Sequence, residues 1–150
     1  MITKNEKNNA MLIHFSGLLS FLVPLGGILG PLVFWNVKKD SSDYVNQEGK
    51  AAVNFNLSFA LYSFIIGLSI VPIILSNIFG LITSNQLLNN DYDSYSYSYH
   101  FDDFNLFGIF GLTAIAFLLQ VIRVVFIINS GIKAGQGATC HYPLSIKFIK

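Results

Sequence analysis

The chain has few charged residues, and long parts of it have none. Charged side chains make up 11% of its 150 residues, whereas a soluble domain carries about 25%. No Asp, Glu, Lys or Arg occurs from residue 8 to 37, from 51 to 90, or from 104 to 122. A soluble helix needs a polar face, and about 20 apolar residues suffice to cross a bilayer. The sequence therefore predicts an all-α integral membrane protein.

The chain also has little net charge and few cysteines and histidines, which excludes further kinds of binding site and cross-link. The net charge of +1 provides no basic surface for nucleic acid. Cys140 is the single cysteine, so no intramolecular disulfide can form. His14, His100 and His141 fall in unrelated regions, and Cys140–His141 lacks further ligands at metal-site spacing. We therefore expect no metal, no cofactor and no nucleic-acid partner. The apolar run from Ala10 is too long for a signal peptide, and no cleavage site closes it.

Three hydrophobic segments account for most of a single domain that covers residues 1–150. They extend over about residues 11–37, 51–83 and 104–128. A polar connection rich in tyrosine and aspartate, residues 84–103, separates the second segment from the third. Each segment is long enough to cross a bilayer as a helix, so we expect three spans.

The first segment contains helix-breaking residues in its middle, namely Pro24, Gly26, Gly27, Gly30 and Pro31. Proline lacks a backbone donor and clashes with the preceding helical turn, so the sequence predicts a kink or break at Pro24. Two arrangements remain open. The segment is either a bent span packed on its neighbours through glycines, or a re-entrant pair of half-helices with both ends on one side. We expect the first arrangement, a bent span.

Arg123 is the only charged residue inside the three segments. It precedes the polar Asn129 by about six residues, roughly 9 Å along a helix. Its side chain can therefore reach the interface by snorkelling. The alternative is an intramembrane cation that pairs with a lipid phosphate or lines a polar cavity.

Short loops set membrane orientation through their Lys and Arg residues. The second connection has none, whereas the first loop and the C-terminal side have several: Lys38, Lys39, Lys50, Lys133, Lys147 and Lys150. We therefore expect a multi-pass protein of the cell membrane, with its first loop and C-terminus in the cytoplasm. Three spans place the N-terminus, with Lys4 and Lys7, outside; a re-entrant first segment returns it inside.

The C-terminal tail alternates apolar and polar residues. Leu144, Ile146 and Phe148 are separated by Ser145 and Lys147. Lysines beside apolar side chains favour contact with anionic headgroups. We expect an interfacial tail that lies on the bilayer surface or folds back on the helices.

Several stretches together resemble a known family: residues 9–18, 30–35 and 38–40, VNQEGKAAVNF at 45–55, residues 132–134, and YPLSIKF at 142–148. They are similar to the bacterial membrane family numbered 4870 among domains of unknown function. That family is distantly similar to the twenty-kilodalton subunit of the chloroplast inner-envelope import translocon. The resemblance covers nearly the whole chain except the tyrosine-rich connection. It implies a small helical membrane domain without assigned activity, and the translocon relative suggests a channel or assembly component.

Polar side chains gather where the first loop enters the second segment. Gln47, Ala51 and Asn54 fall at helical spacing and share a face if the helix begins this early. Such residues either cap the helix and bind the loop, or dock a partner protein or lipid headgroup. No nucleophile, metal or second acid accompanies Glu48, so we do not expect acid–base chemistry there. The candidate contact residues for a partner or lipid are Gln47, Glu48, Asn54 and Arg123.

The sequence contains no catalytic constellation. It favours a small, non-enzymatic membrane protein of unassigned activity, whose partners are the lipid bilayer and either itself or other membrane proteins. The alternative is a subunit of an oligomeric channel or transporter, because proline-broken segments often line binding sites. A membrane enzyme would depend on His14 or His141 as its base, and we do not expect one.

Overall fold

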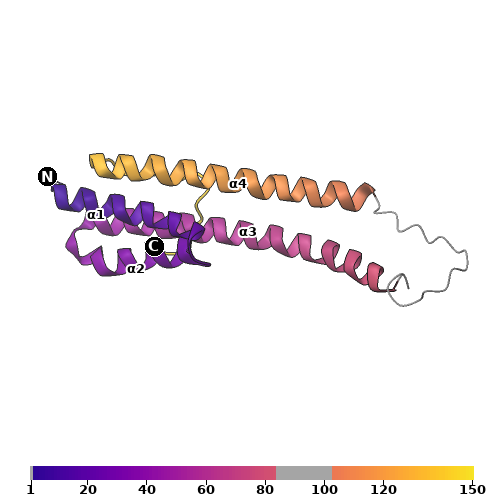
Figure 1. The fold of residues 1–150 in the computed structure, drawn as a ribbon. Helices are drawn as coiled ribbons and strands as arrows, with labels where there is room; N and C mark the ends of the chain where they lie inside the picture. The colour runs from indigo at the N-terminus through magenta and orange to yellow at the C-terminus, as the bar shows by residue number, and fades with distance from the viewer. Residues whose placement is uncertain (1, 84–102) are drawn as a thin grey trace, which may run out of the picture. The chain divides into compact units, whose positions relative to one another are not determined.

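A computed structural model describes residues 2–83 and 103–150 of the chain. Figure 1 shows the helices, which are α1 (Lys4–Phe15), the 3-10 helix η1 (Ser16–Phe21), α2 (Gly26–Lys38), the 3-10 helix η2 (Lys39–Ser41), α3 (Asp43–Thr83) and α4 (Asp103–Gln136). No strand occurs among these residues, which confirms the all-α prediction. The tyrosine-rich connection lies outside the described residues up to residue 102.

The first hydrophobic segment folds as two short helices. The prediction that this segment forms the first of three spans, with a kink at Pro24, is therefore not confirmed. The helix stops at Phe21, and Leu25 takes a left-handed conformation with φ of 62° before α2 begins. Pro24 cannot extend the hydrogen-bonding pattern of the preceding turn, so the chain leaves the helix here. α2 then packs back against α1 and η1 (Figure 1).

Glycines allow the two halves of this α1–α2 hairpin (residues 4–38) to approach closely. A Cβ atom on Gly26 would lie 2.5 Å from the carbonyl oxygen of Leu19. A Cβ atom on Gly30 would lie equally close, at 2.5 Å, to the carbonyl oxygen of Ser16. The backbone of α2 thus rests directly on that of η1, and larger residues at these positions would force the two apart.

The long helices differ from the predicted segments at their ends. α3 begins at Asp43, before the predicted start at residue 51. The hydroxyl of Ser42 caps it by accepting a 3.2 Å hydrogen bond from the Val45 amide. α4 continues past residue 128 to Gln136 and ends at Gly137, whose φ is 88°. The Ala138 amide then donates to the Lys133 carbonyl at 3.1 Å, which satisfies a terminal carbonyl of the helix.

The chain divides into two compact units. Unit 1 comprises Met1–Tyr62 and Leu119–Lys150, and unit 2 comprises Ser63–Leu118. Unit 1 contains the hairpin, the first part of α3, the last part of α4 and the C-terminal segment (residues 138–150). Its buried core consists of two clusters, one formed by Phe55, Phe59, Ile127 and Tyr142 and the other by Ile13, Val45 and Ala52.

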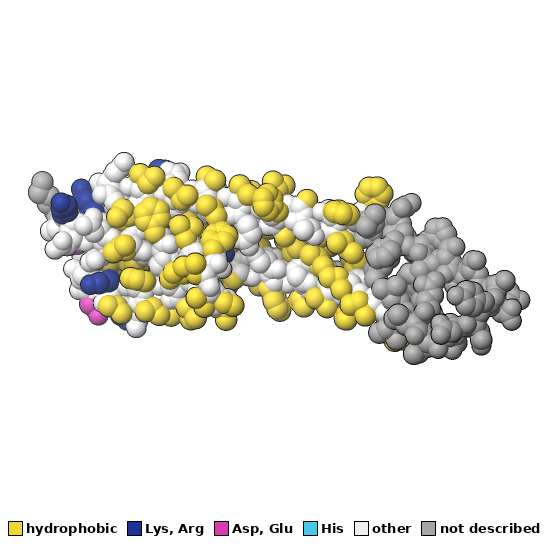
Figure 2. Space-filling model, in the orientation of Figure 1, with side chains coloured by type: hydrophobic (Ala, Val, Ile, Leu, Met, Phe, Trp, Pro, Cys, Tyr) yellow, Lys and Arg dark blue, Asp and Glu magenta, His cyan; other side chains and the backbone are white. Residues whose placement is uncertain are grey.

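Unit 2 exposes many of the apolar side chains that the structure describes. Those with large exposed fractions include Phe64, Leu68, Phe79, Phe107, Phe110 and Phe117. The stretches Asp43–Ser76 and Phe107–Gln136 are both long and apolar enough to cross a membrane. Figure 2 shows hydrophobic side chains over much of the visible face of the described residues. Such exposure is unfavourable in water and normal in lipid, so the structure supports a membrane location.

Candidate functional site

Three side chains of α3 bind residues 144–149 of the C-terminal segment. Tyr62 Oη donates a 3.0 Å hydrogen bond to the carbonyl of Leu144, and Ser58 Oγ accepts a 2.8 Å bond from the amide of Ile146. Asn54 bonds the segment three times. Its Nδ2 donates to the Ile149 carbonyl at 2.9 Å, and its Oδ1 accepts from the Phe148 and Ile149 amides at 3.0 and 2.8 Å.

The spacing of these bonds follows from the geometry of the helix α3 and that of the extended C-terminal segment. Asn54, Ser58 and Tyr62 recur every four residues, about 6 Å along a helix. The backbone groups of the segment that they bind recur every two residues, about 6.6 Å along an extended chain. The two repeats nearly match, so each turn of α3 meets a further backbone group of the segment. The segment thereby gains hydrogen bonds that a neighbouring strand would otherwise supply.

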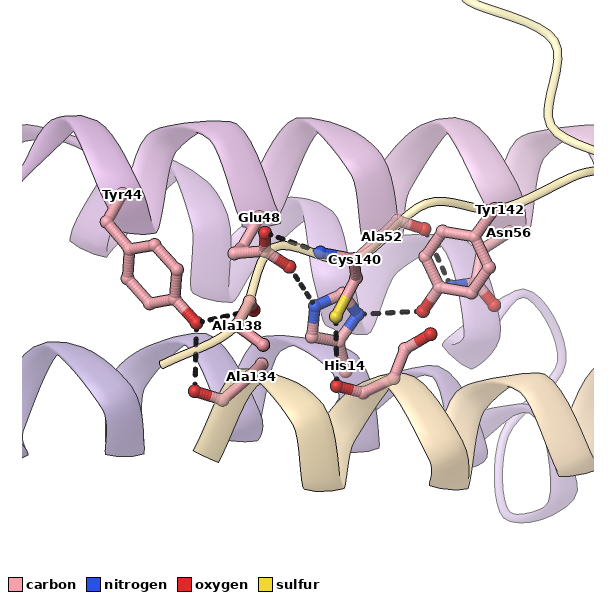
Figure 3. Close-up of polar contacts among 10 residues, drawn as sticks. His14, Tyr44, Glu48, Ala52, Asn56, Ala134, Ala138, Cys140 and Tyr142 are labelled. Carbon is pink, nitrogen blue, oxygen red and sulfur yellow. Dashed lines mark hydrogen bonds and ion pairs between the residues drawn. The ribbon is translucent and has the colours of Figure 1, made fainter. Parts of the chain in front are cut away.

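A buried polar cluster lies where the segment leaves α4. It consists of His14 of α1, Tyr44 and Glu48 of α3, and Cys140 and Tyr142 of the C-terminal segment (Figure 3). His14 and Glu48 are 0% and 2% exposed. His14 Nε2 lies 3.0 Å from Glu48 Oε2, and His14 Nδ1 lies 2.8 Å from Tyr142 Oη. Both ring nitrogens therefore have partners on other segments.

The remaining contacts of the cluster join α3 to the end of α4. The Cys140 amide donates to Glu48 Oε1 at 3.0 Å, so both oxygens of that carboxylate are engaged. The Cys140 thiol donates to the Ser130 carbonyl at 3.2 Å. Tyr44 Oη lies 2.9 and 3.1 Å from the carbonyls of Ala134 and Ala138. The cluster thus connects α1, α3, α4 and the C-terminal segment.

Burial changes the proton affinity of two groups in the C-terminal segment. Desolvation, followed by the nearby Glu48 carboxylate, raises the pKa of the Cys140 thiol to about 12. Desolvation likewise raises the pKa of the Tyr142 phenol. Both groups therefore remain protonated near neutral pH and serve as hydrogen-bond donors.

Arg123 forms a second buried polar contact in unit 1. The residue is 8% exposed, and its Nη2 donates to Asn56 Oδ1 at 2.8 Å and lies 3.5 Å from the Gly17 carbonyl. A Cβ atom on Gly27 would collide with the same Nη2 atom. Within the described ranges no carboxylate pairs with Arg123, so neutral oxygens balance its charge. Its Nε atom has no hydrogen-bond partner there.

The structure places the four sequence-derived contact residues in different surroundings. Gln47 is exposed on α3. Glu48 belongs to the polar cluster, Asn54 holds the C-terminal segment, and Arg123 bonds Asn56. These residues therefore do not form one shared site, although α3 carries three of them.

Sequence reasoning missed the partners of Glu48. It found no further ligand for the Cys140–His141 pair and treated His14 as isolated, yet possible metal-ligand atoms of His14, Glu48 and Cys140 all lie within 4.8 Å of one another. Spacing along the chain could not reveal a cluster assembled from three distant segments. A usable signal was present, however. A lone glutamate and a lone histidine beside apolar helical residues each need a buried polar partner.

Comparison with known protein families gives a match over nearly the whole chain. The model of the MamF_MmsF family, described as the magnetosome magnetite crystal formation protein family, matches residues 5–149. No curated protein and no solved structure matches the chain. The expected resemblance to the bacterial family numbered 4870 was therefore wrong, and the similarity to the chloroplast translocon subunit is withdrawn with it.

Proposed function

The chain belongs to the magnetosome magnetite crystal formation protein family, and we propose that it takes part in this process as a non-enzymatic membrane component. The observation that carries the proposal is the family match over residues 5–149, nearly the full length. In this role the chain assembles with itself or with other membrane proteins. The two apolar helices α3 and α4 agree with a membrane location.

The contacts of the polar cluster support a structural role for it. His14 and Glu48 use their polar atoms to bond each other and the C-terminal segment. Buried polar groups that bond in this way stabilise a fold and specify its arrangement. The alternative of a channel or transporter subunit has no support from the family description or from the two candidate spans.

We place α3 and α4 across the membrane and keep the α1–α2 hairpin on one side of it. Lys4 and Lys7 then lie on the same side as Lys38 and Lys39, which three spans would not permit. Contacts within unit 1 agree, because Gly137 lies beside Lys7 and Trp35 of α2 bonds Asn46 near the start of α3. Figure 2 shows Lys and Arg side chains gathered at this end of unit 1. By the positive-inside rule this side faces the cytoplasm.

Among the four candidate contact residues, we propose that Gln47 meets a partner or lipid headgroup. Gln47 is exposed, whereas Glu48, Asn54 and Arg123 are engaged in bonds inside unit 1. Its position near the charged end of the unit places it at the membrane edge of the proposed topology.

Deleting the gene for this chain tests the proposed process. We expect magnetite crystals of altered size or shape in electron micrographs of the mutant cells, and normal crystals after re-expression of the native chain. A Gln47→Ala chain that reaches the membrane but restores the crystals only in part would support the contact assigned to Gln47. Crystals indistinguishable from those of the parent strain after deletion would contradict the proposal.

Cysteine labelling tests the topology. In a Cys140→Ser background, we expect Asn5→Cys and Ser41→Cys to react with a membrane-impermeant maleimide in inside-out vesicles. Ser94→Cys should react only after permeabilisation, because the connection between α3 and α4 faces the other side. If Asn5→Cys instead behaved like Ser94→Cys, the first segment would cross the membrane and the topology would be wrong.

A further inference from the structure

Three side chains that commonly bind metal ions meet inside unit 1. They are His14 of α1, Glu48 of α3 and Cys140 beyond the end of α4. One potential ligand atom from each lies within 4.8 Å of the other two. The three residues come from three separate segments, so only the folded unit brings them together (Figure 3).

The donor set selects a class of ion. Imidazole nitrogen, carboxylate oxygen and thiolate sulfur together suit Zn²⁺ and other divalent first-row transition metals, whereas Ca²⁺ and Mg²⁺ prefer oxygen ligands only. We propose that His14, Glu48 and Cys140 bind one divalent transition-metal ion of this borderline class, with Zn²⁺ and Fe²⁺ as the two candidates. The proposal is independent of the proposed role in crystal formation.

The distances fit such a site after a small movement. Bond lengths of 2.0–2.3 Å place tetrahedral ligand atoms about 3.3–3.7 Å apart. His14 Nε2 and Glu48 Oε2 lie 3.0 Å apart, and the largest separation in the group is within 4.8 Å. The imidazole and the carboxylate need to separate slightly, and the thiol needs to turn from the Ser130 carbonyl toward them. Three protein ligands leave a fourth position for water.

Neighbouring groups orient two of the ligands. Tyr142 Oη lies 2.8 Å from His14 Nδ1 and can accept a hydrogen bond from Nδ1–H when Nε2 binds an ion. The Cys140 amide holds Glu48 Oε1, which leaves Oε2 directed toward His14. Such outer contacts fix the ligand atoms before an ion arrives.

The charges of the site also balance. Binding of the ion releases the Cys140 thiol proton to solvent. A divalent ion, one carboxylate, one thiolate and a neutral imidazole then sum to zero net charge. A neutral assembly avoids the large penalty for burying an uncompensated charge. Cys140 is only partly buried, and Ala138, Thr139 and His141 beside it are exposed, so an ion can enter from this side.

Protection of the single cysteine tests the proposal in the native chain. In detergent, Zn²⁺ and, under anaerobic conditions, Fe²⁺ should each slow alkylation of Cys140 at least tenfold near one equivalent, and the ion with the lower half-maximal concentration is the preferred occupant. Mg²⁺ should have no effect. Co²⁺ should bind with one-to-one stoichiometry and give a thiolate-to-cobalt absorption band. Absence of both protection and the cobalt band would overturn the proposal.

Variants locate the ligands. We expect His14→Gln and Glu48→Gln to weaken Zn²⁺ protection at least tenfold, with folding checked by circular dichroism and gel filtration. The matched control is His141→Ala, since His141 is exposed next to Cys140 and should not alter protection. Loss of protection in His141→Ala would assign the ion to the adjacent pair and contradict the site. If the His14 and Glu48 variants fail to fold, the cobalt band of the native chain and its persistence in His141→Ala decide the question.

Discussion

At the scale of single residues, unit 1 buries one positive charge beside neutral partners. Arg123 is 8% exposed, and its guanidinium bonds Asn56 Oδ1 at 2.8 Å. Asn56 is held in turn, because its Nδ2 donates to the Ala52 carbonyl one helical turn earlier. A buried cation supported by a single oriented amide depends strongly on that amide, since removing it leaves the charge with little compensation.

We therefore predict a large effect from Asn56→Leu, which keeps the approximate volume and removes the acceptor. The free energy of unfolding should fall by about 2 kcal/mol, the usual value of a hydrogen bond to a charged group. The measurement is denaturant unfolding in detergent micelles. The double variant Asn56→Leu with Arg123→Met should recover much of the loss, because no buried charge remains. Additive losses in a double-mutant cycle would show that the two residues are not coupled.

At the scale of elements, the α1–α2 hairpin depends on backbone contact. Its two halves meet at Gly26 and Gly30, where added Cβ atoms would lie 2.5 Å from carbonyl oxygens of η1. Backbone oxygens in a helix cannot move aside as the end of a flexible side chain can. The close approach is therefore a requirement of the hairpin, and it explains why this segment needs glycine where an ordinary helix favours alanine.

Gly30→Ala should accordingly destabilise the hairpin by about 1–3 kcal/mol, the usual range for overpacking. The matched control is Gly111→Ala in α4, where a Cβ atom meets nothing within 4 Å among the described residues. Hydrogen exchange of the α2 amides should rise in the first variant and stay unchanged in the second. Equal protection in both variants would contradict the tight contact.

At the scale of the whole molecule, the C-terminal segment connects the parts of unit 1. It is bound by Asn54, Ser58 and Tyr62 along α3 and by the polar cluster at its start. The exposed Leu144, Ile146 and Phe148 remain available to the bilayer surface while the backbone faces α3. The two expectations for the tail, surface contact and folding back, are compatible in this geometry.

Asn54→Leu should release the end of this segment, because Asn54 makes three of its bonds. We expect trypsin to cut after Lys147 at least tenfold faster in the variant, as seen by the mass of the product. Gln47→Leu is the matched control, since Gln47 lies on the same helix and is exposed. An unchanged cleavage rate would mean that the segment is held by other contacts.

Part of the fold was predictable because it follows from local patterns. The scarcity of charge predicted apolar helices, and the structure has two that can cross a membrane. The sequence predicted a kink or break at Pro24 within one span, whereas the segment folds as two helices that pack against each other. Proline alone does not say whether a chain bends or turns back. That outcome depends on Leu25 in a left-handed conformation and on the contacts of Gly26 and Gly30 with η1. Such contacts have no signature in sequence spacing.

The sequence by itself determined the helical class, the apolar character of the long helices and the uneven distribution of lysines, because composition and charge are properties of the chain alone. Tertiary structure decided which polar residues act together. His14, Glu48 and Cys140 became neighbours only when α1, α3 and the C-terminal segment packed against one another. The physical reason is that a buried polar group must be satisfied by whichever partner the fold brings near, and distance along the chain does not specify that partner.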